Sequence, residues 1–209
     1  MYLSRLQPDR KLLQVRKDLS SAYQMHATLC RAFCEENQTP PPFLWRFEFE
    51  KDTLPTVLVQ SQLEPDWDKL EARFNGYFQS VPQTKTLSLE QLETQQTLRF
   101  RLKANVTITQ RNPETGKKHR HGLKTLEEQL EWFERQAQKG GFAPLGVMVA
   151  QSERVQMRKH EGGMPITLAS VTFEGHLKIT DLEPFKATLE VGIGHAKALG
   201  FGLLSIAAR

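Results

Sequence analysis

The sequence predicts an α+β protein with two tandem ferredoxin-like domains, each of βαββαβ order. Two observations support this fold class. The first half alternates strand and helix patterns in that order, and the second half repeats the plan in part. At 209 residues, 39% of them hydrophobic, the chain is long enough for two small cores. We therefore expect one ferredoxin-like domain over residues 1–105 and a second over residues 106–209.

The first domain opens with a short strand and an amphipathic helix. Tyr2–Gln7 is the strand candidate, and Ser21 and Gln24 then fit a capping box, in which the serine bonds forward and the glutamine back. Apolar residues follow at helical spacing at positions 22, 25, 29, 32 and 33. This pattern predicts a helix with one buried face.

A hairpin, a second helix and a third strand complete the predicted first domain. Phe43–Glu50 alternates between apolar and charged side chains, and Thr56–Gln62 forms its partner strand after a turn. Asp66 is placed to cap a short helix, and Leu98–Lys103 alternates again. The resulting β-α-β-β-α-β order is that of a ferredoxin-like fold.

The second half follows a similar plan. Thr125 and Glu128 fit a capping box for a helix that ends at Gly140-Gly141. The later elements come in this order: strand pieces at Gly146–Ala150 and Arg154–Arg158, a turn at Glu161-Gly162-Gly163, a long bent strand over Ile166–Phe173 and His176–Ile179, a helix capped by Asp181, and a last strand at Leu203–Ala207. No sequence repeat relates the halves, so the duplication is inferred from element order.

Glycines are concentrated before the last strand. Gly192, Gly194, Gly200 and Gly202 alternate with other residues, among them His195 and Lys197. Lys197 precedes Gly200, which is the wrong order for a Walker A loop, and the segment does not open a βαβ unit as a dinucleotide-binding loop would. Successive N–H groups in such a loop can hold phosphate oxygens, so we predict a cradle for a phosphate backbone. The alternative is an ordinary C-terminal turn.

Basic residues form three clusters in a chain of net charge +4. The clusters are a strand face with Arg99, Arg101 and Lys103, a polar loop with Lys117, Lys118, His119, Arg120, His121 and Lys124, and a hairpin with Arg154, Arg158, Lys159 and His160. Any one of them could be a solvated face. Three clusters together with a glycine cradle favour a polyanionic partner, and a ferredoxin-like scaffold suggests RNA because RRM domains share it. The aromatic sheet signature of an RRM is absent, so base stacking on the sheet is not expected.

Tyr23 and His26 lie three residues apart on the first predicted helix, so their side chains point the same way. His26 can serve as a general acid or base, because imidazole titrates near neutrality, or it can be a half-buried packing residue. His119, His121, His160 and His176 offer no partner that supports a site. No carboxylate or cysteine pattern predicts a metal or cofactor, and no Gly-x-Ser-x-Gly nucleophile motif occurs.

Other features bear on location. Cys30 and Cys34 are four residues apart, which suits neither CxxC chemistry nor a zinc site. The sequence has no hydrophobic signal region at its start and no run long enough to span a bilayer. We therefore expect a cytoplasmic protein with no membrane partner.

The chain resembles the CRISPR-associated endoribonucleases of the CasE type, the repeat-processing subunits of Cascade complexes. The resemblance covers essentially the whole chain. It rests on Met1-Tyr2-Leu3-Ser4, Tyr23-x-x-His26, the run Arg99–Asn105, Phe173-Glu174-Gly175-x-Leu177 and the terminal glycine-rich segment, of which the last is the most specific. Two positions depart from the family pattern: Val106, where many relatives have proline, and His195, at a variable loop position.

The resemblance implies an RNA-processing enzyme with two ferredoxin-like domains. Such proteins bind the stem-loop of CRISPR repeat RNA, cut on its 3′ side without a metal, remain bound to the product and assemble with other Cascade subunits. The family's catalytic histidine and tyrosine correspond to His26 and Tyr23, its RNA-gripping hairpin to Arg154–Gly163, and its glycine loop to Gly192–Gly202. The implied chemistry is attack by the ribose 2′-OH, which leaves a 2′,3′-cyclic phosphate. The alternative function is that of a non-catalytic RNA-binding or assembly subunit.

Overall fold

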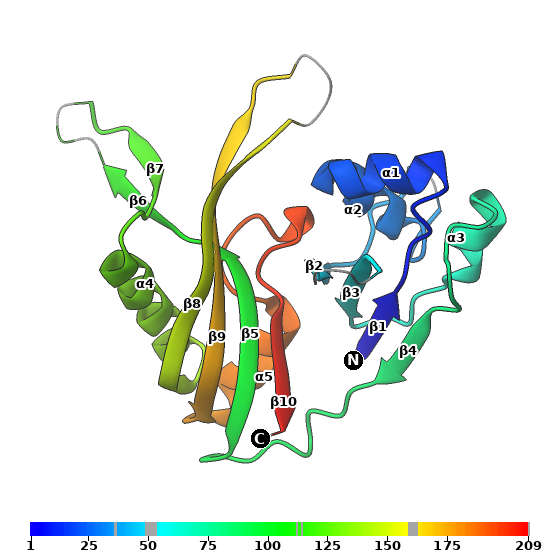
Figure 1. Ribbon diagram of the computed structural model, residues 1–209. Coiled ribbons are helices and arrows are strands. Elements are labelled where there is room, and N and C mark those ends of the chain that lie inside the picture. The colour runs from blue at the N-terminus through cyan, green and yellow to red at the C-terminus, as the bar shows by residue number, and fades with distance from the viewer. Residues whose placement is uncertain (36, 49–53, 112, 114, 159–162, 209) are drawn as a thin grey trace.

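Two four-stranded antiparallel sheets organise the computed structural model shown in Figure 1, which describes residues 1–35, 37–48, 54–111, 113, 115–158 and 163–208. Helices cover one face of each sheet, and each sheet has its own hydrophobic core. A separate two-stranded hairpin lies beside the second sheet (Figure 1). The predicted α+β class with two ferredoxin-like units is confirmed.

The first sheet has the strand order β2-β3-β1-β4. Its strands are β1 (Tyr2–Leu6), β2 (Phe43–Glu48), β3 (Thr56–Ser61) and β4 (Gln83–Thr86), and its helices are α1 (Leu13–Ser20), α2 (Ala22–Cys30) and α3 (Asp68–Arg73). The side chains of Met25 and Leu29 from α2 pack in the core with Trp45 and Val59 from the sheet. Ser21 caps α2 through the forward bond of the expected capping box, because its side chain accepts a hydrogen bond from the Gln24 amide.

The second sheet has the strand order β10-β5-β9-β8. Its strands are β5 (Thr97–Asn105), β8 (Phe142–Met157), β9 (Ile166–Ile179) and β10 (Leu204–Ala208), covered by α4 (Leu126–Lys139) and α5 (Leu182–Val191). Both expected capping-box bonds are present between Thr125 and Glu128 at the start of α4. Stacked rings of Phe100, Phe133 and Phe173 join α4 to the sheet.

The structure corrects the placement of one strand. β5, predicted to complete the first domain, pairs with β9 and β10 of the second sheet. The reason is burial: Leu98, Phe100 and Leu102 alternate into the second core, whereas the fourth strand of the first sheet is β4, a short polar strand with no apolar alternation. The first sheet therefore ends at Thr86 and the second begins at Thr97, so the predicted division at residue 105 does not coincide with the boundary between the sheets.

Two hairpins extend from the second sheet. The basic loop near residue 117 is a hairpin of β6 (Thr107–Arg111) and β7 (Lys118–Gly122), where the sequence predicted no strands. The two predicted strand pieces before residue 158 form one strand, β8, which pairs along its whole length with β9. In Figure 1 the far end of this β8–β9 hairpin rises beside α1 and α2. No helix in the described ranges is long and apolar enough to cross a membrane.

Candidate functional site

His26 is held on α2 with one side against the first sheet. Its ring stacks on Phe43 of β2 at a centroid distance of 5.0 Å, and the side chain is half-buried. The Nδ1 atom is buried and has no hydrogen-bond partner among the described residues. Because a buried Nδ1 cannot meet a ligand, Nε2 is the nitrogen available for proton exchange.

The glycine-rich segment meets α2 at the boundary between the sheets. Within it, η1 (Lys197–Leu199), a 3₁₀ turn, packs against α2 and β2. The Trp45 indole N–H donates to the Ala198 carbonyl at 3.3 Å. This packing brings a C-terminal lysine to the helix that carries His26.

His26 and Lys197 line the same cavity, of about 480 Å³, which we call the histidine cavity. It lies between α2, the start of β2, the end of α5 and η1, and is lined by His26, Pro40, Pro41, Pro42, Phe43, Leu44, Gln62, Glu190, Val191, Lys197 and Ala198. Its walls combine one imidazole, one ammonium and one carboxylate with mostly apolar surface. A cavity with few polar groups on apolar walls is typical of a reactive site.

Burial lowers the pKa of both basic groups in the histidine cavity. The pKa of His26 lies below its ordinary value of 6.5, because burial disfavours the imidazolium. The pKa of Lys197 is lowered by burial as well. At neutral pH His26 is therefore a neutral imidazole that can accept a proton, and an anion bound in the cavity would favour the charged form of Lys197.

Tyr23 lies one turn before His26 on α2, as predicted, and is partly exposed. Among the described residues that line the histidine cavity, Tyr23 is absent. The histidine cavity therefore joins His26 to Lys197, whereas the predicted partner Tyr23 lies outside its lining.

The glycines of the C-terminal loop serve close packing more than phosphate binding. The amides of Gly192, Gly200 and Gly202 donate to the carbonyls of Thr188, Lys197 and Lys103, respectively. All four glycines have positive φ, and a Cβ at Gly200 would lie 3.2 Å from the Trp45 ring. A phosphate cradle built from the amides of Gly192, Gly200 and Gly202 would require these bonds to break.

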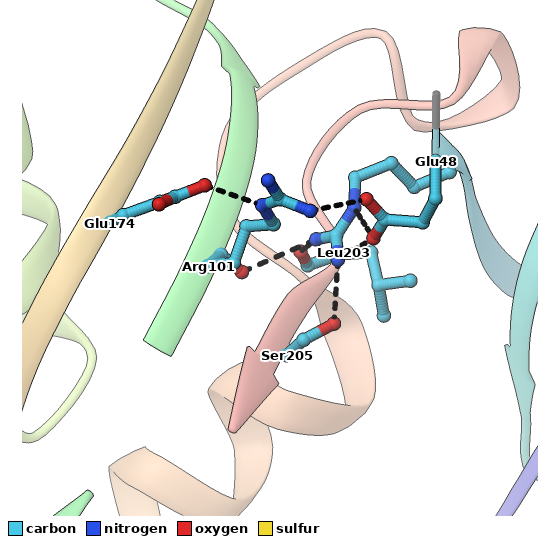
Figure 2. Close-up of polar contacts among 6 residues, drawn as sticks. Glu48, Arg101, Glu174, Leu203 and Ser205 are labelled. Carbon is cyan, nitrogen blue, oxygen red and sulfur yellow. Dashed lines mark hydrogen bonds and ion pairs between the residues drawn. The ribbon is translucent and has the colours of Figure 1, made fainter. Parts of the chain in front are cut away.

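The three cations of β5 lie on one face of the strand but have different surroundings. Arg99 lines an open groove on the outer face of the second sheet. Arg101 donates to Glu48 and to Glu174, at 2.6 Å each (Figure 2). Lys103 lies 5.6 Å from the centroid of the Phe201 ring, and burial lowers its pKa.

Arg101 is therefore an ion-paired link between strands, with its charge already balanced by two carboxylates. Arg99 and Lys103 remain predicted RNA contacts.

The β8–β9 hairpin closes a second cavity, of about 560 Å³, which we call the hairpin cavity. It is lined by Leu19, Ser20, Ser21, Ala22, Gln24, Phe47, Lys103, Glu153, Val155, Gln156, Met157, Arg158, Leu199, Gly200 and Phe201. Arg154 is exposed on the same strand, and Lys159 lies outside the described residues. The hairpin cavity and the histidine cavity thus both border the η1 segment, with residues 199–200 lining the first and residues 197–198 the second.

His195 lies exposed on the loop and forms an isolated bridge with Asn105. Burial and the positive charges of Arg120 and Lys197 lower its pKa. Its place near Arg120 joins the loop to the basic β6–β7 hairpin. His195 lines neither of the two cavities.

Sequence reasoning missed two contributors to the site. The Pro40–Pro42 segment lines the histidine cavity, and its three consecutive prolines were a signal for a rigid wall. The buried Arg46 of β2 had no such signal, because its alternation with Trp45 and Phe47 predicted an exposed side chain. Within the described ranges no group of His, Cys, Asp or Glu side chains is arranged to hold a metal ion.

Comparison with known proteins finds one family over nearly the whole chain. A family model described as CRISPR associated protein matches residues 1–208. The chain is 37% identical to the CRISPR-associated endoribonuclease Cse3 of Thermus thermophilus, over 99% of this chain and 100% of that protein. It is 31% identical to the CRISPR system Cascade subunit CasE of Escherichia coli, over 99% of both chains. A solved structure of CRISPR endoribonuclease Cse3 bound to 19 nt RNA superposes with a TM-score of 0.84 at 36% identity, covering 99% of this chain and 100% of the other.

Proposed function

Since the chain belongs to the family of CRISPR-associated proteins, we propose that it is an endoribonuclease that binds the stem-loop of CRISPR repeat RNA and cuts the precursor transcript into guide RNAs. The observation that carries this proposal is the shared cavity of His26 and Lys197 at the boundary of the two sheets. An imidazole can accept the proton of the RNA's own 2′-hydroxyl, and an ammonium group can stabilise the charge that develops on the phosphate.

The proposed reaction is transesterification at phosphorus. The ribose 2′-oxygen forms a bond to the adjacent phosphorus while the bond from phosphorus to the 5′-oxygen breaks, which yields a 2′,3′-cyclic phosphate and a 5′-hydroxyl. Nε2 of the neutral His26 accepts the 2′-OH proton, in agreement with the lowered pKa of this residue. The leaving 5′-oxygen takes a proton from water.

Lys197 has the complementary role in this proposal. Its ammonium group would stabilise the negative charge that builds up on the phosphorane oxygens, and in a half-buried cavity such a charge acts more strongly than in water. Tyr23, one turn from His26, would orient the sugar-phosphate. This mechanism uses no metal and no cofactor.

RNA binding is assigned to the hairpin cavity and to the β8–β9 hairpin beside it. Arg154 of β8 and Arg158, which directly follows this strand, would hold phosphates of the stem together with Lys103, and Lys159 is expected to extend this grip. Retention of the product and assembly with other Cascade subunits in the cytoplasm follow from the same family membership and complete the proposal.

Single-turnover cleavage tests the assignment. Purified protein with a CRISPR repeat stem-loop RNA should make one cut in EDTA, and His26→Ala should slow it by roughly 10²–10⁴-fold with little change in RNA affinity. His176→Ala is the matched control, because His176 lines the open groove on the second sheet instead of the histidine cavity. Equal losses of rate and affinity in His26→Ala would return this histidine to a packing role.

A substrate change tests the nucleophile without altering the protein. An RNA with 2′-deoxyribose immediately 5′ of the scissile bond should bind almost unchanged, since phosphates and stem shape supply the affinity, and should resist cleavage. Cutting of this RNA would rule out 2′-OH attack, and inhibition by EDTA would indicate metal-activated water. Tight binding of the natural RNA with no cut under any condition would favour the non-catalytic alternative.

A further inference from the structure

Arg46 is a buried cation at the boundary between the two sheets, only 2% exposed to solvent. Its Nε and Nη2 atoms donate to Oε1 of Glu48, and Nη2 also donates to Ser205 Oγ at 3.0 Å. Nη1 donates to the backbone carbonyls of Leu203 at 2.9 Å and Arg101 at 3.2 Å (Figure 2). A guanidinium group has five N–H donors, and each one has an acceptor here.

The acceptors of Arg46 join the first sheet to the second. β2, which carries Arg46 and Glu48, is an edge strand of the first sheet, and β10, which carries Ser205, is an edge strand of the second. Leu203 lies between the glycine-rich loop and β10. The guanidinium therefore fixes the end of this loop to β2 with bonds of fixed direction.

Three residues directly before Arg46 contact the other parts of the site. Phe43 stacks on His26, a Cβ on Gly192 would lie 2.8 Å from the Leu44 side chain, and Trp45 contacts both Gly200 and Ala198. Thus four consecutive residues of β2 contact the proposed base, three residues of the loop that carries Lys197, and Leu203 directly after that loop.

The loop needs this support because its conformation is strained. Ala196, directly before Lys197, has φ +66°, in the left-handed region that is unfavourable for a residue with a Cβ. Such a residue persists only where the surrounding structure holds it in place. The contacts from β2 lie on both sides of Ala196 in the sequence, at Gly192 and at Ala198 and beyond.

We propose that Arg46 is a positioning residue, which sets the place of Lys197 relative to His26 by fixing the loop end at Leu203. This inference rests on the proposed function. Stability alone is a poor explanation for a cation at this place, because burying a charge is costly and an apolar side chain of similar length often stabilises a protein as well or better. Directional bonds to Leu203 and Ser205 are what an apolar side chain cannot supply.

A double-mutant cycle with Lys197 tests the proposal. Arg46→Met should lower the single-turnover rate at saturating protein by roughly 10²-fold, the cost of a misplacement of about 1 Å, with RNA affinity nearly unchanged. Lys197→Ala should lower the same rate by roughly 10²–10³-fold. Because Arg46 acts through Lys197, adding Arg46→Met to Lys197→Ala should cost less than about threefold more.

Glu174→Gln is the matched control, since among the described residues Glu174 bonds to Arg101 and makes none of the five bonds of Arg46 (Figure 2). It should cleave at close to the wild-type rate. Arg46→Lys, which keeps the charge but has three donors in another geometry, should fall between wild type and Arg46→Met and keeps the test valid if the methionine variant does not fold.

Three results would each overturn the positioning role. The first is a double variant in which the two rate losses multiply. The others are a wild-type rate in Arg46→Lys and equal losses of rate and RNA affinity in Arg46→Met. Failure of the proposed function has a different signature, namely a wild-type protein that binds the repeat RNA and does not cut it.

Discussion

The environment of His26 selects one protonation state. Its ring stacks on Phe43 and its Nδ1 is buried, so the charged form loses hydration without gaining a partner. Glu190 lines the same cavity, yet within the described part of the chain it forms no hydrogen bond with His26. A neutral imidazole is ready to accept a proton and poorly suited to donate one, which favours the base over the acid role that the sequence left open.

The pH dependence of cleavage should show this choice. The pKa of His26 lies below 6.5, so the fraction of the base form falls only as the pH drops through that lowered value. The single-turnover rate constant should therefore be level near neutrality and fall on the acid side, at a pH below 6.5. If His26 were a general acid, the pH–rate profile would have the opposite slope, because the rate would fall as the pH rises past the same pKa. Rates measured from about pH 4.5 to 8 distinguish the two limbs, with His26→Ala expected to lose this dependence.

At the scale of elements, the C-terminal loop and β2 form one packed unit. Gly202 has φ +89°, and a Cβ there would lie 2.7 Å from the Ile193 carbonyl oxygen. The Ile193 amide in turn donates to the Gly202 carbonyl at 2.9 Å. The two ends of the loop are thus closed directly on each other, with no room for a side chain between them.

Gly202→Ala should consequently destabilise the protein more than its backbone angle alone explains. Gly76 offers a matched control, because its φ is +77° but nothing lies within 4 Å of its Cβ position. Gly76→Ala should cost roughly 1–2 kcal/mol of unfolding free energy from the left-handed backbone, and Gly202→Ala should cost about 1–3 kcal/mol more from the clash. Urea unfolding of both variants measures the difference, and equal losses would show that the loop relaxes without resistance.

Local patterns predicted most helices and strands, and non-local packing explains the differences. Local signals include the helix caps at Ser21 and Thr125 and the apolar alternation of residues 98–103. The structure contains the elements that these signals predict, which are α2, α4 and β5. Which sheet β5 joins depends on contacts with β9, some 70 residues later, which no local pattern encodes. The sequence named His26 and Lys197 as candidates, and both line the histidine cavity, but the ion pairing of Arg101 and the burial of Arg46 depend on the meeting of two sheets.

The β8–β9 hairpin should contribute to RNA affinity through charge. Arg158 lines the hairpin cavity and is exposed, as phosphate contact requires. Arg158→Ala should weaken stem-loop binding and reduce the slope of log affinity against log salt by somewhat under 1. Lys139→Ala removes an exposed cation from the end of α4, away from the hairpin in Figure 1, and should leave the slope unchanged. An unchanged slope in Arg158→Ala would remove this residue from the phosphate contacts.

For the whole molecule, the proposed site exists only where two separate cores meet. The first core is built from residues 6–77 and the second from residues 98–204. Specific contacts besides the Arg46 network hold this boundary together. Gln60 of β3 donates to the Leu189 carbonyl of α5 at 2.5 Å. Leu199 and Met157 from the second half pack on the first core. His26 comes from one side of this boundary and Lys197 from the other, so their separation depends on how the two sheets are held together.

We therefore expect the two sheets to unfold as one cooperative unit. Opening the first core alone would leave Arg46 without the carbonyls of Leu203 and Arg101 and would expose the apolar surface around Trp45, which makes a half-unfolded state costly. Hydrogen exchange followed by mass spectrometry in increasing urea checks this, with peptides from β3 and β9 as reporters of the two cores. Both peptides should show the same opening free energy and the same dependence on urea, because both report the global transition. The first domain unfolds alone if the β3 peptide opens at a lower free energy, and with a smaller urea dependence, than the β9 peptide. The distance between His26 and Lys197 would then vary with each such opening.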